Sequence, residues 1–437
     1  MCQYSTQPAL AQRAALLEDS PIGSFLGLAG QPGLISLAGG IPDARYFALD
    51  AVARAARRVL RRQRGAALQY AACAGIAPLR EWVAAHLRGQ GLAFAPEQIL
   101  ITSGSQQALD LLGKVLVDPA SPLLVQRPTY LGALQAFAPY APRFVGLECD
   151  EQGPRLQDFV DALPGARMAY LQPHFANPGG HGIGVARAEA LASALKGRPC
   201  WLVEDDAYGQ LWFEAPPQPG LLSRGISHGA HVGTFSKMVF PGLRLGWVAA
   251  REPLLGRLLL AKQAADLGCS CWNQWVLLDM LEHGVLEDCL PRLRALYRSR
   301  RDAMLEALER HMPECVRWSR PRGGLFVWLE MPRRIDGEDV AHAVRKLGVV
   351  VVPGRYFDCG AGGCARFGDC CDCRFAADAQ AAAPARHTLR LSYATASARA
   401  IDIAVERLAV VLRDALRATA ARVPVHAATP PPDINPV

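Results

Sequence analysis

The sequence predicts an α/β protein with a mostly parallel sheet covered by helices on both faces, followed by a smaller α+β domain. Three observations carry this prediction. Short apolar runs alternate with amphipathic helical patterns through the middle of the chain, as in βα units. Polar residues follow the predicted strands, at the edge where an open parallel sheet has its site. After about residue 295, a long helical pattern leads into further strands.

The first strand of the predicted sheet lies in EQILITSG at 97–104 and stops at Ser-Gly. The helix predicted after it, from Ser105, has Leu109, Leu112 and Leu116 on one stripe. Because helical patterns separate the later strands, a parallel arrangement is favoured. Those strands are predicted within 121–130, 167–180, 200–213, 231–237 and 244–250.

The chain is expected to divide into four segments. Residues 1–45 form an N-terminal segment that joins the small domain, and residues 46–295 form the large domain. Residues 296–418 form the small domain, which contains the helical pattern LPRLRALYRSRRDAMLEALERHM and strands in PRGGLFVWLEM and HTLRLSYA. Residues 419–437 are rich in proline and alanine, which predicts a disordered tail.

Charge and composition argue against several function classes. The net charge of +7 is small for 437 residues. The basic run at 54–64 has no interleaved aromatic residues, so we interpret it as a solvated helix face and expect no nucleic-acid binding. No apolar run is long enough to span a bilayer, and the N-terminus has no secretory pattern, so no membrane association is expected. Thirteen mostly isolated cysteines are typical of reduced thiols, and we expect a cytoplasmic protein.

Lysine is rare in this chain. Of the 47 basic residues only five are lysines, and one of these, Lys237, lies among small and hydroxylated residues in GTFSKMVFPGLRLGW. A lysine can lose its proton and act as a nucleophile, whereas an arginine stays protonated, so we interpret Lys237 as a residue chosen for amine chemistry. The other four lysines are Lys114, Lys196, Lys262 and Lys346.

The residues at the strand ends suit a phosphate-bearing cofactor attached to Lys237. The segment TSGSQQ provides backbone N–H groups at a helix start, and Gly104 lets the backbone come close to a phosphate. Asp205 follows a buried strand and could keep a pyridine nitrogen protonated, with Asp206 as the competing carboxylate. Other groups that could hold such a cofactor are supplied by Tyr130, Asn177, Tyr208, Thr234, Ser236 and Arg244.

Eight motifs in order carry a resemblance to a known family. They are LQYAACAGIAPLRE, ITSGSQQALDL, RPTY, PHFANPGG, VEDDAYGQLWF, GTFSKMVFPGLRLGW, PRGGLFVWLEMP and LRLSYA. Over roughly residues 20–415, the chain resembles the pyridoxal-phosphate-dependent aminotransferases of fold type I, class I/II. It is most similar to the branch with 2-aminoadipate aminotransferase and the aminotransferase-like domains of MocR regulators. The resemblance implies the PLP-dependent transferase fold type I, a large domain that binds pyridoxal 5′-phosphate (PLP), and a homodimer.

The resemblance also implies a role for each matching residue. Lys237 would bind PLP covalently and then transfer a proton, and Asp205 would pair with the pyridine nitrogen, because the Asp-x-Ala-Tyr spacing fits the family. Tyr208 and Asn177 would hydrogen-bond the ring oxygen. The other implied contacts are Ser105, Gln106, Thr234, Ser236 and Arg244 with the phosphate, Tyr130 with the ring face, Arg390, Asn177 and Gly40 with the substrate, and Tyr70 with the phosphate of the neighbouring subunit. No metal is expected.

The implied function is an aminotransferase that moves an amino group between an L-amino acid and a 2-oxo acid. Two alternatives stay open. A lyase, decarboxylase or oxidase of specialised metabolism could use the same cofactor, because the fold does not fix the reaction. A ligand-sensing regulator domain is the remote alternative, since fewer than about 40 residues precede SLAGGIPD, too few for a DNA-binding domain of typical size.

The chain departs from the family pattern at two places. An insertion at about 358–386 contains five cysteines whose spacings match no common zinc pattern. We interpret it as a mobile loop, with a metal or redox site or a substrate lid as alternatives. In DSPIGSFLGL, Gly23 stands where relatives that take acidic side chains can present an arginine. Because Ile22, Phe25 and Leu26 surround this position in the sequence, we expect an apolar or aromatic substrate.

Overall fold

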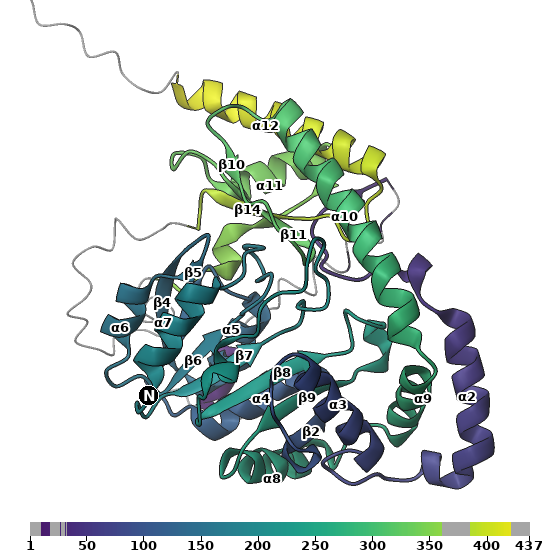
Figure 1. The fold of residues 1–437 in the computed structure, drawn as a ribbon. Helices are drawn as coiled ribbons and strands as arrows, with labels where there is room; N and C mark the ends of the chain where they lie inside the picture. Colours follow the sequence, from purple (N-terminus) through teal and green to yellow (C-terminus); the bar gives the residue numbers. More distant parts are fainter. Residues whose placement is uncertain (1–9, 18–26, 28–30, 32, 361–384, 421–437) are drawn as a thin grey trace, which may run out of the picture.

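The computed structural model describes residues 10–17, 27, 31, 33–360 and 385–420 (Figure 1). The predictions for Gly23 and its neighbours, for nearly all of the cysteine-rich insertion, and for most of the tail concern residues outside these ranges.

An eight-stranded sheet forms the centre of the larger part of the molecule (Figure 1). Its order is β2-β9-β8-β7-β6-β3-β4-β5. The pairs from β8 through β7, β6 and β3 to β4 are parallel, whereas β9 and β5 run antiparallel to their neighbours. This is the mostly parallel sheet that the sequence predicts. The strands are β2 Ile99–Thr102, β3 Pro122–Arg127, β4 Arg143–Asp150, β5 Gly153–Pro154, β6 Met168–Leu171, β7 Trp201–Asp205, β8 Gly229–Thr234 and β9 Gly246–Ala250.

Helices cover this sheet on both faces, which explains why every residue of β2, β6, β8 and β9 is buried. In α4, the predicted stripe of Leu109, Leu112 and Leu116 is buried. The basic run of α2 is not entirely solvated, because Arg58 donates a 2.8 Å hydrogen bond to buried Asp279 of α9. The helices are α2 Leu49–Gln63, α3 Ala77–Gly89, α4 Ser105–Leu116, α5 Leu131–Phe137, α6 Leu156–Ala162, α7 Val185–Leu195, α8 Leu254–Asp266 and α9 Cys271–Glu282.

A smaller antiparallel sheet, of order β10-β11-β14-β13, forms the second part of the molecule. The N-terminal segment reaches this part, because β1 pairs in parallel with β12. The strands are β1 Ile35–Ser36, β10 Arg317–Trp318, β11 Phe326–Glu330, β12 Val349–Val350, β13 Val352–Pro353 and β14 Thr388–Ser392, and the helices are α10 Val285–His311, α11 Gly337–Lys346 and α12 Ala398–Ala420.

Two boundaries differ from the sequence prediction. The boundary expected at 295–296 lies inside α10, one continuous helix that runs from the large part to the small part (Figure 1). Helix α12 extends to Ala420, two residues into the segment predicted as a disordered tail. Every helix within the described ranges is too short or too polar to cross a membrane.

Short 3₁₀ helices connect the main elements. They are η1 Gln12–Leu16, η2 Ala44–Tyr46, η3 Arg64–Leu68, η4 Pro96–Gln98, η5 Ala138–Tyr140, η6 Leu221–Arg224, η7 Pro241–Leu243 and η8 Gly354–Phe357.

Candidate active site

A cavity of about 560 Å³ lies where β3, β6, β7 and β8 end. Strands of the small sheet close it, through Phe326 of β11 and Arg390 of β14. Tyr70, which follows η3, does not line this cavity, and it is 86% exposed. All the other predicted site residues line it: Gly40, Ser105, Gln106, Tyr130, Asn177, Asp205, Tyr208, Thr234, Ser236, Lys237, Arg244 and Arg390.

Asp205 ends the buried strand β7 and lies on the cavity wall. Its Oδ2 accepts a 2.7 Å hydrogen bond from the hydroxyl of Tyr170, whereas its Oδ1 has no hydrogen-bond partner among the described residues. Burial raises the pKa of Asp205 to about 6, although the hydrogen bond from Tyr170 lowers it. A buried carboxylate oxygen without a partner is costly, so this atom is ready for a donor from a bound molecule.

The competing carboxylate, Asp206, has a different environment. Its Oδ1 accepts from the backbone N–H of Gly209, and its Oδ2 lies 3.1 Å from Nδ1 of His174. Burial alone would raise the pKa of Asp206, but the neighbouring imidazole of His174 brings it below its usual value. Since Asp206 already has its partners and does not line the cavity, Asp205 is the carboxylate available to a cofactor.

Lys237 follows β8 and is half-buried in the cavity wall. Its Nζ donates a 2.8 Å hydrogen bond to the carbonyl of Gly40. Burial, with the guanidinium groups of Arg390 and Arg244, lowers the pKa of Lys237 to about 8. The neutral, nucleophilic amine is therefore accessible near neutral pH.

Gly40 is required by close packing. A Cβ at this position would lie 2.3 Å from Cζ of Phe326, inside the contact distance of any two heavy atoms. The absence of a side chain lets the backbone carbonyl reach Lys237 while the Phe326 ring stays in place.

Arg390 of β14 is buried and fixed in orientation. Its guanidinium donates a 2.9 Å hydrogen bond to Oδ1 of Asn177 and a 2.5 Å hydrogen bond to the carbonyl oxygen of Ala38. The ring centroids of Phe326 and Phe357 lie 4.3 and 4.8 Å from its Cζ. Burial lowers the pKa of Arg390 to about 10, and its buried Nε has no partner within the described part of the chain. A planar cation held in this way suits a carboxylate.

The N-terminus of α4 opens on the cavity through Ser105 and Gln106. Gly104 precedes it with a φ of +79°, and no side chain caps the helix. Ser105 and Gln106 therefore present the first turn, and the exposed guanidinium of Arg244 lies beside Gly104, where its Nη2 would be 2.9 Å from an added Cβ. A helix N-terminus with an adjacent guanidinium is a site for a phosphate.

Four further residues complete the walls of the site. Thr234 Oγ1 accepts from the N–H of Ser236 at 3.1 Å, which closes the turn after β8 and places both hydroxyls on the cavity wall. Tyr130 precedes α5, and burial raises its pKa to about 12. Burial also raises the pKa of Tyr208, so both phenols are protonated donors at neutral pH.

Sequence reasoning missed several residues of the site. Tyr170 orients Asp205 from the neighbouring strand β6, and Gln172 exchanges hydrogen bonds with the backbone of Asn177. Ser103, which follows β2, does not line the cavity. The alternation of side chains along β6, which places Tyr170 and Gln172 on one face, was the available signal.

Metal ligands do not gather in the described ranges. No three His, Cys, Asp or Glu side chains there lie close enough together to hold a metal ion. Most cysteines of the insertion lie outside those ranges.

The residues present fit PLP. The unpartnered Oδ1 of Asp205 would accept from the pyridinium N–H, Lys237 offers its amine, and the N-terminus of α4 with Arg244 would take the phosphate. Tyr130, Tyr208 and Asn177 also line the cavity.

Comparison with known proteins agrees with this geometry. Residues 33–408 match the model of the family "Aminotransferase class I and II". The chain is 37% identical over 422 residues to 2-aminoadipate transaminase of Thermus thermophilus, covering 95% of this chain and 99% of the relative. It is 35% identical to aromatic-amino-acid aminotransferase 1 of Thermococcus litoralis, covering 81% of this chain and 86% of the relative.

A solved structure gives the same result. The crystal structure of LysN, an α-aminoadipate aminotransferase of T. thermophilus complexed with N-(5′-phosphopyridoxyl)-L-leucine, matches with a TM-score of 0.82 and 36% identity over 94% of this chain and 98% of that one. These relatives are aminotransferases, which favours amino transfer over the lyase, decarboxylase, oxidase and regulator alternatives. The chain therefore belongs to the class I and II aminotransferase family, with fold type I, and is a PLP-dependent aminotransferase.

Proposed function

We propose that this aminotransferase takes amino acids with apolar or aromatic side chains in preference to dicarboxylic ones. The observation that carries the proposal is the set of positively charged side chains that line the cavity. Among the described residues that line it, the cations are Lys237, Arg244 and Arg390, and each is placed for another task. A distal carboxylate would find no further partner there, and an unpaired charge in such a site loses several kcal/mol of hydration.

The neutral part of the lining supports the same proposal. Ile41, Leu131 and Ala207 line the cavity together with the ring of Phe326. An apolar side chain would bury its surface against these groups at a gain of roughly 25 cal/mol per Å².

Each residue of the site has a defined task in the proposed reaction. Arg390 binds and orients the substrate carboxylate, and Asn177 holds Arg390 in that direction. Nζ of Lys237, with its pKa lowered to about 8, accepts the Cα proton and later returns it. With PLP bound, the carboxylate of Asp205 would accept a hydrogen bond from the protonated ring nitrogen and so keep it protonated. PLP, when bound, supplies the electron-withdrawing ring on which amino and oxo acids interconvert.

The substrates in the names of the relatives indicate which amino acids to compare as donors for this protein. One relative is a 2-aminoadipate transaminase and another acts on aromatic amino acids. The structure of LysN holds a phosphopyridoxyl derivative of leucine, so that similar protein accommodates an apolar side chain at the cofactor.

Side-by-side kinetics test the proposal. The donors are leucine, phenylalanine, glutamate and 2-aminoadipate, each measured with the same acceptor oxo acid. We expect kcat/KM to be larger for leucine or phenylalanine than for 2-aminoadipate, with glutamate serving at most as the amino partner of the other half-reaction. A clear preference for the two dicarboxylates would overturn it.

We also propose a homodimer in which Tyr70 reaches the phosphate site of the partner subunit. Tyr70 is 86% exposed and lies outside its own cavity, and the neighbouring Leu68 is 68% exposed. Large exposed side chains so close together in the chain suit a protein interface. A cytoplasmic location and a role in amino acid metabolism stay predictions.

A further inference from the structure

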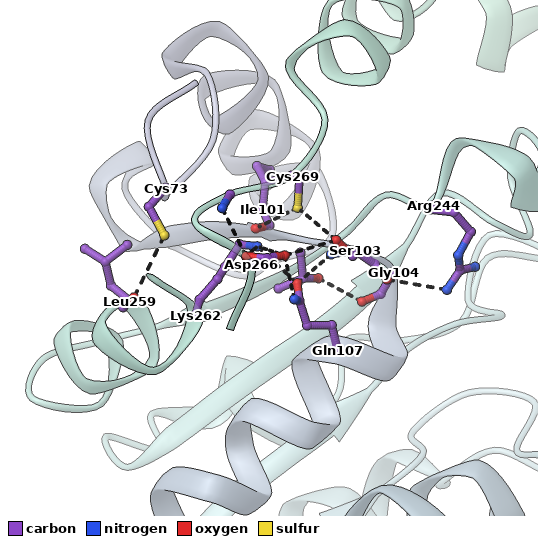
Figure 2. A network of polar contacts seen from close by, with 12 residues as sticks. Cys73, Ile101, Ser103, Gly104, Gln107, Arg244, Leu259, Lys262, Asp266 and Cys269 are labelled. Atoms are coloured by element: carbon purple, nitrogen blue, oxygen red, sulfur yellow. Dashed lines mark hydrogen bonds and ion pairs between the residues drawn. The ribbon is translucent and has the colours of Figure 1, made fainter. Parts of the chain in front are cut away.

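Lys262 is fully buried, and it belongs to a network of polar contacts at the turn before α4 (Figure 2). The Lys262 side chain has no exposed surface, which is rare for lysine. Its Nζ donates to Oδ1 and Oδ2 of Asp266, both at 2.7 Å, and to Oε1 of Gln107 at 3.1 Å. An ammonium has three N–H donors, so these three acceptors use all of them. A compact ammonium meets this need, whereas a planar guanidinium does not.

Asp266 and Gln107 are also linked to each other and to the turn before α4. Gln107 Nε2 donates a 2.7 Å hydrogen bond to Asp266 Oδ2. Gln107 Oε1 accepts a 2.8 Å hydrogen bond from the backbone N–H of Ser103. The hydroxyl of Ser103 donates to Asp266 Oδ2 at 3.3 Å. Figure 2 shows Asp266 and Gln107 beside Ser103, with each linked to it.

Ser103 is thereby held on three sides. Its N–H and its hydroxyl are bound by Gln107 and Asp266, and its carbonyl accepts from Nη2 of Arg244 at 3.4 Å. Ser103 directly precedes Gly104, whose positive φ turns the chain into α4. The position of Ser103 therefore sets the direction of the N–H groups at Ser105 and Gln106, and its carbonyl is an acceptor for the guanidinium of Arg244.

The cluster does not touch the cavity. Lys262, Asp266, Gln107 and Ser103 are all absent from its lining, so any effect on a bound molecule passes through the turn. A buried ion pair is weak evidence for stability, because apolar residues of similar size often replace it at no loss. The hydrogen bonds from Asp266 and Gln107 to Ser103 give this ion pair another role, which is to hold the turn before α4.

We infer that Lys262, Asp266 and Gln107 are positioning residues for the cofactor phosphate, which hold the Ser103–Gly104 turn and Arg244 in the geometry that binds it. The inference rests on PLP binding at this site. It predicts that the cluster acts on the phosphate end of the cofactor and leaves the ring end, at Asp205 and Lys237, unaffected.

The test compares PLP with pyridoxal, which has the same ring and aldehyde but no phosphate. The dissociation constants of both are measured by absorbance titration of the full-length cofactor-free protein, together with its melting temperature. For Lys262→Met we expect PLP affinity to fall about tenfold or more, the size typical of removing a group behind a ligand, while pyridoxal affinity changes less than about twofold.

Lys114→Met is the matched control. Lys114 also forms an i,i+4 pair, with Asp110 at 4.0 Å, but that pair lies on the half-exposed side of α4. We expect this variant to bind PLP and pyridoxal as the original protein does.

A second variant covers the case in which Lys262→Met does not fold, since it leaves the Asp266 carboxylate without its cation. The double change Lys262→Met with Asp266→Leu removes both charges and should show the same selective loss of PLP affinity. Equal losses for PLP and pyridoxal in the folded variant, or an unchanged PLP affinity, would show that the cluster is structural and overturn the inference.

Discussion

The hydroxyl of Tyr170 donates a 2.7 Å hydrogen bond to Oδ2 of Asp205, and both side chains are buried. Tyr170 comes from β6 and Asp205 ends the adjacent strand β7, so the sheet itself fixes this pair. With Oδ2 occupied, Oδ1 is the oxygen left for the pyridine nitrogen of the cofactor.

Tyr170→Phe should move the pH dependence of the reaction. The hydrogen bond from Tyr170 lowers the pKa of Asp205, so its loss raises that pKa above about 6 and protonates the carboxylate at higher pH. The reaction needs the carboxylate form, hence the acidic limb of kcat/KM should shift upward, by about one pH unit. Tyr140→Phe is the control, because Tyr140 donates a 2.8 Å hydrogen bond to Asp110 away from the cavity. An acidic limb at the same pH in both variants would contradict this role.

The reactivity of Lys237 should follow its lowered pKa. The rate at which cofactor-free protein attaches PLP should rise with pH and level off above about 8, because the deprotonated amine is the nucleophile. Arg390→Gln removes one of the charges that lower this pKa and should move the inflection to higher pH. Stopped-flow absorbance measures both rates, and an inflection near 10.5, the ordinary lysine value, would show that burial does not act on Lys237.

Arg390→Gln should weaken substrate binding. The substrate carboxylate would lose a charged, oriented partner worth on the order of 2–4 kcal/mol, which corresponds to a KM raised on the order of a hundredfold. Arg390→Lys should restore little, because an ammonium cannot form the paired hydrogen bonds of a guanidinium. Steady-state kinetics decide this, with the PLP affinity measured as the control. An unchanged KM with normal PLP binding would show that another group binds the substrate carboxylate.

Tyr70 should act across the dimer. Tyr70→Ala and Lys237→Ala are each expected to be nearly inactive alone. When the two variant subunits are mixed by refolding, half of the dimers are hybrids, and each hybrid has one site with both residues intact. Activity should then recover to about a quarter of that of the original protein. No recovery in hybrids verified by tagged purification would place Tyr70 outside the partner's site.

The polar residues at the ends of the strands explain why most of the site could be predicted from the sequence. Asn177 follows β6, Asp205 ends β7 and Lys237 follows β8. These three strands are neighbours in the sheet, and parallel strands bring such residues to one edge. The choice of Asp205 over Asp206 agrees with the alternation of side chains along β7, which turns neighbouring carboxylates to opposite faces.

The remaining features depend on contacts between distant segments. Nothing local distinguishes Lys262 from a surface lysine, because its burial arises where α8 packs on α4, 155 positions away at Gln107. The sequence pattern changes at about residue 295, but α10 continues through the boundary expected there, because a helix can leave one core and enter another without a break. Tyr170 lies in an apolar strand, so the sequence around it does not indicate a role in the site. Only the pairing of β6 with β7 brings it to Asp205.

The most direct test of amino transfer by this protein is a half-reaction without an acceptor. Purified, PLP-loaded protein is mixed with leucine, and the cofactor spectrum and products are followed, with Lys237→Ala as the inactive control. An aminotransferase should release about one equivalent of 2-oxo acid per subunit and leave the cofactor in its amine form. Release of carbon dioxide or ammonia, or continued oxo acid formation with consumption of oxygen, would contradict an aminotransferase.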